Sequence, residues 1–413
     1  MEFTISRNSL LRALQRTRTV ISGNRDALFK DFVFTFPEES AMDINTTNGR
    51  VWMKETVTLE EPVKDPRPIS VWYGDLLRSV KSLDEQILRF DVGEYQMTVI
   101  HDCGKFRLPL TNVASQFIEH AKPCPDAEAE DGVSFNYEAP GLRSILSQCK
   151  FAMSNNDLRP TMKGVYMNFT GQFTDYVSSD GLQLIRVRKA PMFDNKLVSF
   201  SLILPSNIVS TLLRILPTTG DVRFEYQKGL IVEKERKGWH NEVEKYMAVE
   251  RNSAARVIID DNITLTFETV EGRYPAYWTV IPDYCHFEMT IDRRALVKSV
   301  DRLSIFQSSS GMVEIDVTNT VCRLKTEDGD FDTCGDEKLP CECRMSDGRD
   351  TLPISLIHVG LKTSSLAAVL KTLSGEKVVV RFIDKSRAVV IVPQHQPDVE
   401  EITMLLMPML LDD

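Results

Sequence analysis

The strongest constraint on how this chain folds is a pattern of apolar residues that occurs three times along its 413 residues. In each copy, three apolar residues are separated by seven and then four positions, and a second apolar triad follows with offsets of four and seven. The first triads are Phe3/Leu10/Leu14, Phe135/Leu142/Leu146 and Met289/Leu296/Val300; the second triads are Leu76/Val80/Leu83, Val209/Leu213/Leu216 and Leu366/Leu370/Leu373. The pattern predicts one folding unit present in three copies.

Length and composition agree with this interpretation. A chain of 413 residues can bury three separate cores, and 42% hydrophobic with 26% charged residues is typical of a globular protein. We expect domain boundaries near residues 128 and 286, so that the domains span 1–128, 129–286 and 287–413. No apolar run approaches the ~20 residues that span a bilayer, and no signal segment opens the chain, so we expect a cytoplasmic protein without membrane contact.

Each copy predicts two helices and several strands. The triads have the spacing of amphipathic helices, and alternating apolar runs such as 87–90 and 378–382 have the spacing of strands. A turn-like segment at 384–386 predicts a hairpin from 378–382 into 388–392. The sequence therefore predicts an α+β fold, with three similar domains of two helices packed on antiparallel sheets.

Basic residues recur at the helix positions that point away from the predicted core. Seven of the nine equivalent outward positions are basic, although acidic residues outnumber basic ones 59 to 49, and residues 3–25 hold five arginines and no acid. Ser144 and Gln148 are the two exceptions. One interpretation is an ordinary solvated helix face; the other is a surface that faces a polyanion without reading sequence. The net charge of −10 argues against nucleic-acid binding by the whole surface.

Several short motifs resemble the bacterial DNA sliding clamp family, the beta subunits of DNA polymerase III. They occur in the family's order along the whole chain and are Met1–Ile5, Met153–Pro160 with Gly164, Ser178–Gly181, Glu271–Pro275, Val280–Pro282 and Leu406–Met409. Each motif is weak alone; together with the threefold repeat they are specific. The resemblance implies a ring-shaped homodimer that encircles duplex DNA and tethers the replicative polymerase, without catalysis and without a cofactor.

In such a ring the helices line the hole and contact DNA phosphates independently of sequence. The resemblance and the outward positions together give the following DNA-binding residues: Arg12, Arg16, Arg25, Lys81, Arg159, Arg214, Lys298, Arg302 and Lys371.

The resemblance also implies a dimer interface between the first domain of one chain and the third domain of its partner. The matching positions are Phe106 and Leu108, on an alternating strand, and Ile305 with Phe306. An edge strand needs a partner, and two-fold symmetry would satisfy both ends of the chain at once. The alternative is that these four residues belong to the core.

A second implied surface is a groove that captures short peptides of the replicative DNA polymerase, the clamp loader and repair proteins. Its expected lining residues are Met162, Ser179, Gly181, Leu182, Gln183, Leu184, Pro275, Val280, Leu406, Met407, Pro408, Met409 and Leu411. Methionine and aliphatic side chains suit varied peptides. The apolar C-terminal run can also be read as a final core strand.

The chain departs from the family at several of these positions. Family members commonly carry His-Arg where this chain has Leu182-Gln183, and basic residues at the positions of Thr279 and Leu410. Ser206-Asn207 replaces a basic pair, and Pro160-Thr161 replaces aromatics associated with DNA contact. We therefore expect a more apolar groove, a weaker DNA grip through the middle domain, and a diverged or accessory clamp.

Other chemistries receive little support from the sequence. Cys322, Cys334, Cys341 and Cys343 lack the paired spacing of a zinc site, and Asp328/Asp330/Asp332 begin a calcium-like loop that Thr333 and Leu339 do not continue. We expect residues 326–350 to form a solvated loop without a metal. Phosphate-loop and metalloprotease motifs are absent from the sequence. The alternatives to a clamp are an interaction scaffold that does not encircle DNA and a metal-dependent nucleic-acid-processing enzyme.

Overall fold

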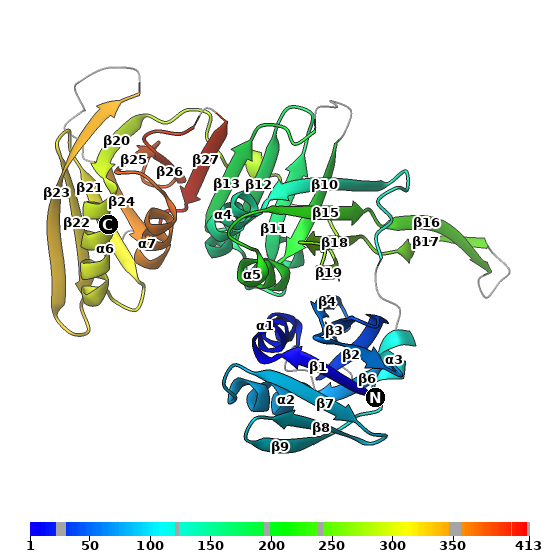
Figure 1. Ribbon diagram of the computed structural model, residues 1–413. Helices are drawn as coiled ribbons and strands as arrows, with labels where there is room; N and C mark the ends of the chain where they lie inside the picture. The colour runs from blue at the N-terminus through cyan, green and yellow to red at the C-terminus, as the bar shows by residue number, and fades with distance from the viewer. Residues whose placement is uncertain are drawn as a thin grey trace. The chain divides into compact units, whose positions relative to one another are not determined.

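The computed structural model describes residues 1–21, 30–119, 124–193, 199–237, 243–346, 357–397 and 399–410. Its elements follow one another in the same order three times: a strand, a helix, strands, a second helix and further strands (Figure 1). The predicted α+β class with antiparallel sheets is confirmed.

The three copies differ only in small additions. The first contains β1 (Glu2–Ser6), α1 (Arg7–Thr17), η1 (Arg18–Val20), β2 (Asp31–Glu38), β3 (Ala41–Thr47), β4 (Val51–Thr58), β5 (Glu61–Lys64), β6 (Ile69–Trp72), α2 (Tyr73–Lys81), β7 (Ile87–Val92), β8 (Gln96–His101) and β9 (Gly104–Pro109), followed by α3 (Ala114–Glu119). The second contains β10 (Gly132–Glu138), α4 (Ala139–Cys149), η3 (Lys150–Ala152), η4 (Pro160–Met162), β11 (Gly164–Phe169), β12 (Thr174–Ser179), β13 (Gln183–Lys189), β14 (Phe200–Pro205), α5 (Ser206–Ile215), β15 (Asp221–Gln227), β16 (Leu230–Lys237), β17 (Val243–Arg251), β18 (Ala254–Ile259), β19 (Ile263–Glu268) and η5 (Tyr277–Thr279). The third contains β20 (Phe287–Asp292), α6 (Arg293–Leu303), η6 (Ser304–Phe306), β21 (Met312–Val317), β22 (Val321–Asp328), β23 (Thr333–Met345), β24 (Ile357–Lys362), α7 (Thr363–Thr372), β25 (Lys377–Phe382), β26 (Val389–Pro393) and β27 (Glu400–Leu406).

Sheets continue from one copy into the next. The strand orders are β5-β1-β7-β8-β9, β10-β15-β18-β19-β4-β3-β2-β6, β14-β11-β12-β13-β27-β26-β25-β20-β23-β22-β21-β24, and the pair β16-β17. The last strand of the second copy, β19, pairs antiparallel with β4 of the first. The last strand of the third copy, β27, pairs in the same way with β13 of the second.

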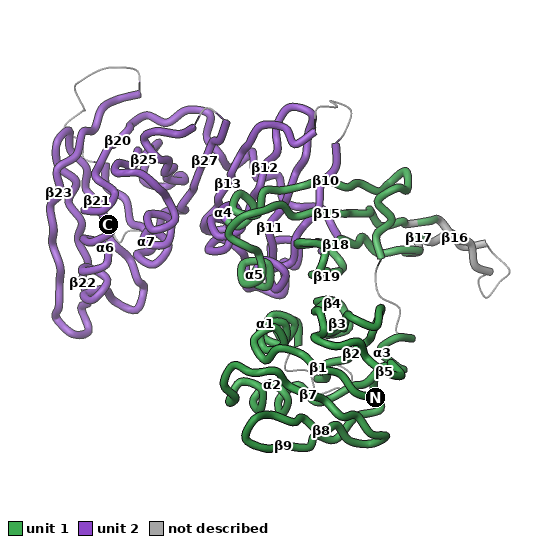
Figure 2. Tube along the Cα trace, viewed as in Figure 1, with its two compact units in different colours: residues 1–143, 210–269 green, residues 144–209, 270–413 purple. Residues whose placement is uncertain are grey.

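The chain divides into two compact units (Figure 2). One comprises residues 1–143 and 210–269, and the other residues 144–209 and 270–413. The division passes through the middle copy, so the domain boundaries expected near residues 128 and 286 stay a prediction.

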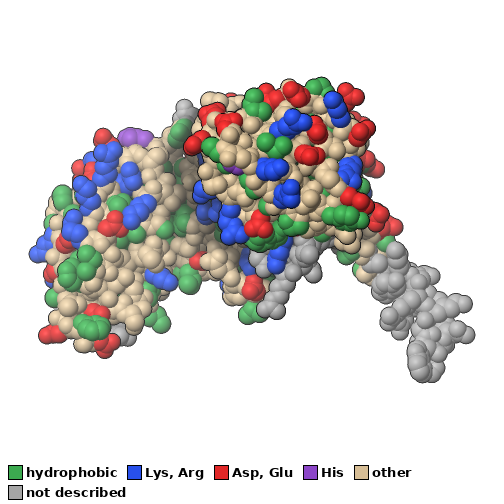
Figure 3. Space-filling view, turned by 60° about the horizontal axis from the view of Figure 1, so that its bottom comes forward, with side chains coloured by type: hydrophobic (Ala, Val, Ile, Leu, Met, Phe, Trp, Pro, Cys, Tyr) green, Lys and Arg blue, Asp and Glu red, His purple; other side chains and the backbone are tan. Residues whose placement is uncertain are grey.

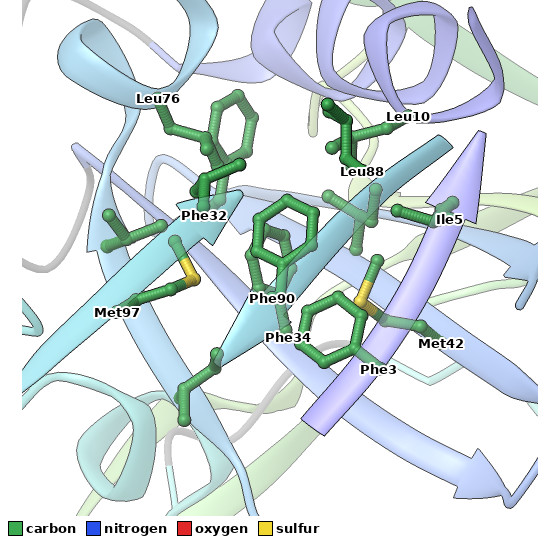
Figure 4. Close-up of a cluster of buried hydrophobic side chains, with 14 of the residues drawn as sticks. Phe3, Ile5, Leu10, Phe32, Phe34, Met42, Leu76, Leu88, Phe90 and Met97 are labelled. Carbon is green, nitrogen blue, oxygen red and sulfur yellow. The ribbon is translucent and has the colours of Figure 1, made fainter. Parts of the chain in front are cut away.

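The apolar triads lie in the core, as predicted. In the first copy Phe3, Leu10 and Leu76 are at most 2% exposed and belong to one buried cluster (Figure 4). Phe3 stacks on Phe90 with ring centroids 4.6 Å apart. Of the eighteen triad residues only Leu83 and Leu213 are half-buried rather than buried. The core position of the triads is therefore confirmed.

An arginine of the first helix holds the end of the second helix in every copy. Arg7 donates to the carbonyl oxygens of Val80 (3.1 Å) and Lys81 (2.9 Å) at the end of α2. Arg143 of α4 donates to the α5 carbonyl of Leu213 at 2.9 Å, and Arg293 of α6 donates to the α7 carbonyl of Leu370 at 3.0 Å. The last carbonyls of a helix have no partner within the helix, and a cation there also opposes the helix dipole. These guanidinium groups therefore fasten each helix pair.

The solvated loop expected over residues 326–350 is wrong for the described part of that segment. Residues 321–328 and 333–345 form the hairpin β22–β23, and only 329–332 form its turn. Polar side chains occupy one face of an exposed strand, so the segment has the composition of a loop although its backbone pairs as a sheet. Cys341 and Cys343 point to the other face and are buried.

We predict that Leu10→Ala lowers the free energy of unfolding by about 2–5 kcal/mol, because the side chain is 1% exposed and its loss leaves a cavity among aromatic residues. The exposed neighbour gives the control Ser9→Ala. Urea unfolding followed by circular dichroism measures both variants. Equal midpoints for Leu10→Ala and Ser9→Ala would contradict the assigned core.

Candidate nucleic-acid interface and peptide groove

The predicted outward basic residues lie on the solvent side of their helices. Arg12, Lys81, Arg214 and Lys298 are exposed, as are Arg302 and Lys371, whereas Arg16 is half-buried. Among the described residues, no carboxylate lies within ion-pair distance of Arg12, Lys81, Arg214 or Lys298. Because no carboxylate of the described ranges competes for these four cations, they are available to an external anion.

Three of the predicted cations have carboxylate partners. Arg16 binds Glu55 at 2.9 Å, Lys371 binds Asp301 at 2.8 Å, and Arg302 holds Glu337 through two hydrogen bonds of 2.7 and 2.6 Å.

The Arg16 pair differs from the other two because its carboxylate is buried. Glu55 is 3% exposed, and burial raises the pKa of its carboxyl group, while the charge of Arg16 opposes that rise. The pairs at Arg302 and Lys371 are exposed and weak in water. A polyanion can therefore displace the carboxylates of Arg302 and Lys371 more easily than that of Arg16.

The structure collects several arginines around one hollow of about 480 Å³ in the first unit. Arg12, Arg16 and Arg18 come from α1 and η1, and Arg214 comes from α5. Arg18 was not predicted as a site residue, although it lies in the acid-free segment with five arginines. Four guanidinium groups in one hollow form a local positive site on a chain of net charge −10. On the face drawn in Figure 3, by contrast, basic and acidic side chains are intermixed.

Two predicted DNA-binding residues are not among these helix positions. Arg25 lies outside the described residues. Arg159 is exposed, but it lines the apolar cavity of the second unit. Ser144 is exposed and Gln148 is half-buried, so the middle copy presents no charge at either position.

The predicted peptide groove corresponds to a cavity of about 500 Å³ within the second unit. Nine of the predicted residues line it: Met162, Ser179, Gly181, Leu182, Gln183, Leu184, Pro275, Val280 and Met407. Leu406, Pro408 and Met409 are not among its lining residues, and Leu411 lies outside the described residues. The structure adds Leu158, Arg159, Pro160, Thr161, Tyr274, Ala276, Tyr277 and Leu405.

Strand alternation explains why Leu405, and not Leu406, reaches the cavity. Leu405 is opposite Leu184 on the paired strands β27 and β13, and opposite residues share a face of the sheet. Leu406 therefore points to the other face, where it is 2% exposed. The C-terminal run is a core strand that also lines the cavity through Leu405 and Met407, and its role in peptide binding stays a prediction.

Two tyrosines form a fixed wall of the groove. The Tyr277 hydroxyl donates to Asp175 at 2.6 Å, and Arg188 donates to both oxygens of the same buried carboxylate at 2.7 and 2.9 Å. Tyr274 stacks on Tyr166 with centroids 4.7 Å apart. Burial raises the pKa of both wall tyrosines, so the phenols are neutral at physiological pH. The wall presents aromatic surface at low entropic cost.

A tight turn presents Leu182 at the rim. The Asp180 carboxylate accepts the backbone N–H groups of Leu182 (2.8 Å) and Gln183 (2.9 Å). Gly181 has a φ of +95°, and a Cβ there would lie 2.8 Å from Arg159. The Gln183 side chain donates to Asp180 and to the carbonyl of Phe151. Gln183 therefore supports the turn, while Leu182, 63% exposed, lies at the rim of the cavity.

The rim is consequently apolar. Leu158, Val280 and Met407 are 87%, 53% and 41% exposed and line the same cavity as Leu182. Exposed apolar side chains around one cavity are typical of a binding surface. Arg159 is the one charged side chain in the lining, as far as the described residues show.

The residues predicted for a dimer interface flank two sheet edges. Phe106 is half-buried and Leu108 is 6% exposed on β9, whereas Ile305 and Phe306 after α6 are 75% and 37% exposed. Their role in an interface stays a prediction.

The described residues contain no group of three His, Cys, Asp or Glu side chains arranged to hold a metal ion. In the same ranges no helix is long and apolar enough to cross a bilayer.

No family model matches the sequence. The beta sliding clamp of Pseudomonas aeruginosa is 22% identical over 417 residues, and the match covers 100% of both chains. The beta sliding clamp of Lactococcus lactis is 21% identical, with 96% of each chain covered. Among solved structures, the DNA polymerase sliding clamp from Pseudomonas aeruginosa matches with a TM-score of 0.81 and 20% identity, and the DNA polymerase III beta subunit from Thermotoga maritima with 0.81 and 16%, each over 100% of both chains. The chain therefore has the fold of the bacterial sliding clamps, as the resemblance implied.

We predict that only Cys103, Cys124 and Cys334 react rapidly with a thiol reagent in the folded protein, since these three are exposed. Burial raises the pKa of Cys322 to about 12 and of Cys341 to about 11, so both thiols stay protonated and unreactive at pH 8. Titration with Ellman's reagent at pH 8 measures the number of reactive thiols, first in the native protein and then in guanidinium chloride. Rapid native reaction of Cys322, located by peptide mapping, would contradict the packing.

Proposed function

We propose that this chain is the subunit of a DNA sliding clamp, a ring-shaped homodimer that encircles duplex DNA and tethers a DNA polymerase. The observation that carries the proposal is the recurrence of exposed basic residues on equivalent helices of a clamp fold. Phosphate contacts of this kind are independent of sequence, so a closed ring can slide. The proposed role is not catalytic and needs no cofactor.

Closure of the ring follows from two unpaired sheet edges. Within the chain, β4 pairs with β19 and β13 pairs with β27, which joins the fourth strand of one copy to the last strand of the next. The remaining members of this series are β23 and β9. Residues 333–340 of β23 pair with β22 on one side only, and β9 pairs with β8 on one side only; the other edge of each has no partner among the described strands. If β23 of each chain pairs with β9 of the other chain, both junctions form at once and the dimer is closed.

Burial at equivalent positions supports this interface. Val20 and Ala152 end the short 3-10 turns after the first helices of copies one and two, and they are 4% and 0% exposed. Phe306 occupies the same position in the third copy and is 37% exposed. A large aromatic exposed where its counterparts are buried indicates a junction that a second chain completes.

The DNA grip is expected to be uneven around the ring. On their first helices, copies one and three supply Arg12 and Lys298, which have no carboxylate partner within the described ranges; Ser144 occupies the same position in copy two. The middle copy contributes Arg214 from its second helix. We infer that copies one and three carry most of the phosphate contacts.

The groove supports binding of short peptides from the replicative polymerase, the clamp loader and repair proteins. Its lining is mostly apolar, with tyrosine and methionine side chains, and Arg159 is the one arginine among the described lining residues. We infer that clients bind chiefly through apolar side chains. The altered turn at Leu182 and Gln183 favours a client set narrower than that of a clamp with a basic rim.

We predict that the protein, once loaded, stays on nicked circular DNA and leaves the same DNA after linearisation, because a ring can escape only over a free end. Gel filtration of the labelled protein with each DNA measures retention. Equal loss from circles and linear DNA would contradict encirclement and favour the interaction scaffold; metal-dependent cleavage of the DNA would favour the enzyme.

The double variant Arg12→Glu, Lys298→Glu tests whether these cations hold the DNA. It is expected to keep the dimer, lose retention on circles at moderate salt, and show a smaller dependence of binding on salt concentration, because two phosphate contacts are lost.

We predict that Leu182→Asp weakens binding of a fluorescent polymerase-derived clamp-binding peptide by about tenfold or more, because a charge replaces an exposed apolar anchor. Val399→Asp is the control, since Val399 is 68% exposed and lies outside the cavity lining. Fluorescence anisotropy measures both affinities. Unchanged binding by Leu182→Asp would refute the assignment of the groove.

A further inference from the structure

We propose that the acidic turn between β22 and β23 docks on a second copy of this chain, with Phe331 seated in a hollow beside β9. The inference rests on the proposed dimer and adds the residue register of its junction. It also names the side chain that closes one end of that junction.

The two internal junctions have one register. The hairpins β3–β4, β12–β13 and β22–β23 each close around four residues, at the pairs Thr47↔Trp52, Ser179↔Leu184 and Asp328↔Thr333. The residue after each closing position is therefore equivalent: Met53, Ile185 and Cys334. At the internal junctions Met53 is opposite Leu265, and Ile185 is opposite Met404.

The last strands can be aligned in the same way. Leu265, Met404 and Phe106 are each opposite the equivalent valine or isoleucine of the preceding strand, namely Val257, Ile391 and Val99. The repeat therefore places Phe106 of one chain opposite Cys334 of the other. This register puts Pro109 opposite Phe331.

Burial at the paired positions agrees with this register. At the internal junctions Met53, Ile185, Leu265 and Met404 are all at most 1% exposed. Phe106 is half-buried and Cys334 is exposed. The third pair thus lacks the cover that the first two pairs give each other.

One backbone hydrogen bond of the internal junctions cannot form at the third. Glu268 donates its N–H to the carbonyl of Arg50 at 3.4 Å, and Met407 donates to the carbonyl of Leu182 at 2.8 Å. Pro109 is the equivalent donor position, and proline has no N–H. The carbonyl it would meet belongs to Phe331. This end of the junction therefore depends on side chains.

Complementary apolar surfaces lie at that end. A hollow of about 390 Å³ beside β9 is lined by Gly93, Glu94, Tyr95, Gln96, Arg107, Leu108 and Pro109. Tyr95 is 76% exposed on one surface, and Phe331 is 78% exposed on the other. Burial of these two aromatic rings against each other and against Pro109 would stabilise this end of the junction in place of the absent backbone hydrogen bond.

Charge also fits a second copy. Asp328, Asp330 and Asp332 surround Phe331 in the turn, and β9 carries the exposed Lys105 and Arg107. Glu94 in the hollow carries the same negative charge as the turn and is the one unfavourable charge among these residues. Pairing the acidic turn with the basic strand favours this orientation and disfavours pairing β9 with a second β9, which would bring like charges together.

The register is tested by Phe106→Cys. Residues directly opposite on antiparallel strands have Cα atoms about 4.5–5.5 Å apart, within disulfide range. Mild oxidation of the full-length protein is expected to give a covalent dimer on a non-reducing gel. Adding Cys334→Ser is expected to abolish that band, which excludes cross-linking through Cys103 or Cys124. A covalent dimer that persists without Cys334, or a dimer in solution without the cross-link, would overturn the register.

The docking is tested by Phe331→Ala, with Ile118→Ala as the control at another exposed apolar residue. The dimer dissociation constant from analytical ultracentrifugation is expected to rise about tenfold or more for Phe331→Ala, and not for Ile118→Ala. An unchanged constant together with the Phe106→Cys cross-link would refute the docking and leave the proposed ring intact. A monomer at all concentrations would instead refute the ring.

Discussion

The structure depends on backbone hydrogen bonds between copies. Each copy ends one sheet with a strand whose outer edge would be unpaired alone, and β19 and β27 meet that requirement by pairing with β4 and β13. Exposed strand edges invite uncontrolled association. The repeat therefore also predicts where a second chain pairs. β9 and residues 333–340 of β23 are the members of the series with one edge unpaired in the described part of the chain.

This constraint separates the helices from the junctions. Because strands join the copies, the helices need only pack on the sheets beneath them, and their outer faces are free to carry charge. The arginines that fasten each helix pair, Arg7, Arg143 and Arg293, bond to carbonyl oxygens instead of facing solvent with the others. The same helices thus carry two kinds of basic residue: those that bond to carbonyl oxygens of the neighbouring helix, and those that face solvent. An acidic chain can accordingly carry a local basic surface.

Residue spacing predicted the α+β class, the buried triads and the hairpin from 378–382 into 388–392, which is present as β25 and β26. These features depend on local periodicity. The β22–β23 hairpin was missed because alternating charged residues give an exposed strand the composition of a loop. Nine groove residues were predicted from motifs, whereas Leu405 required the strand register and Tyr277 required the buried Asp175 that binds it. Pairing across distant segments cannot be read from local spacing.

The departures of this chain from the clamp motifs form a consistent set. At the cavity, the side chains of Asp180 and Gln183 are hydrogen-bonded to each other within the turn, and Leu182 is exposed at its rim. At the first helices, Arg12 and Lys298 keep an exposed charge that Ser144 lacks. The middle copy therefore presents no charge at this helix position, while it supplies the turn and much of the wall of the cavity. Since the exposed cations and the cavity use different helices and strands, in the proposed clamp a change in client preference need not weaken the DNA contacts of the other two copies.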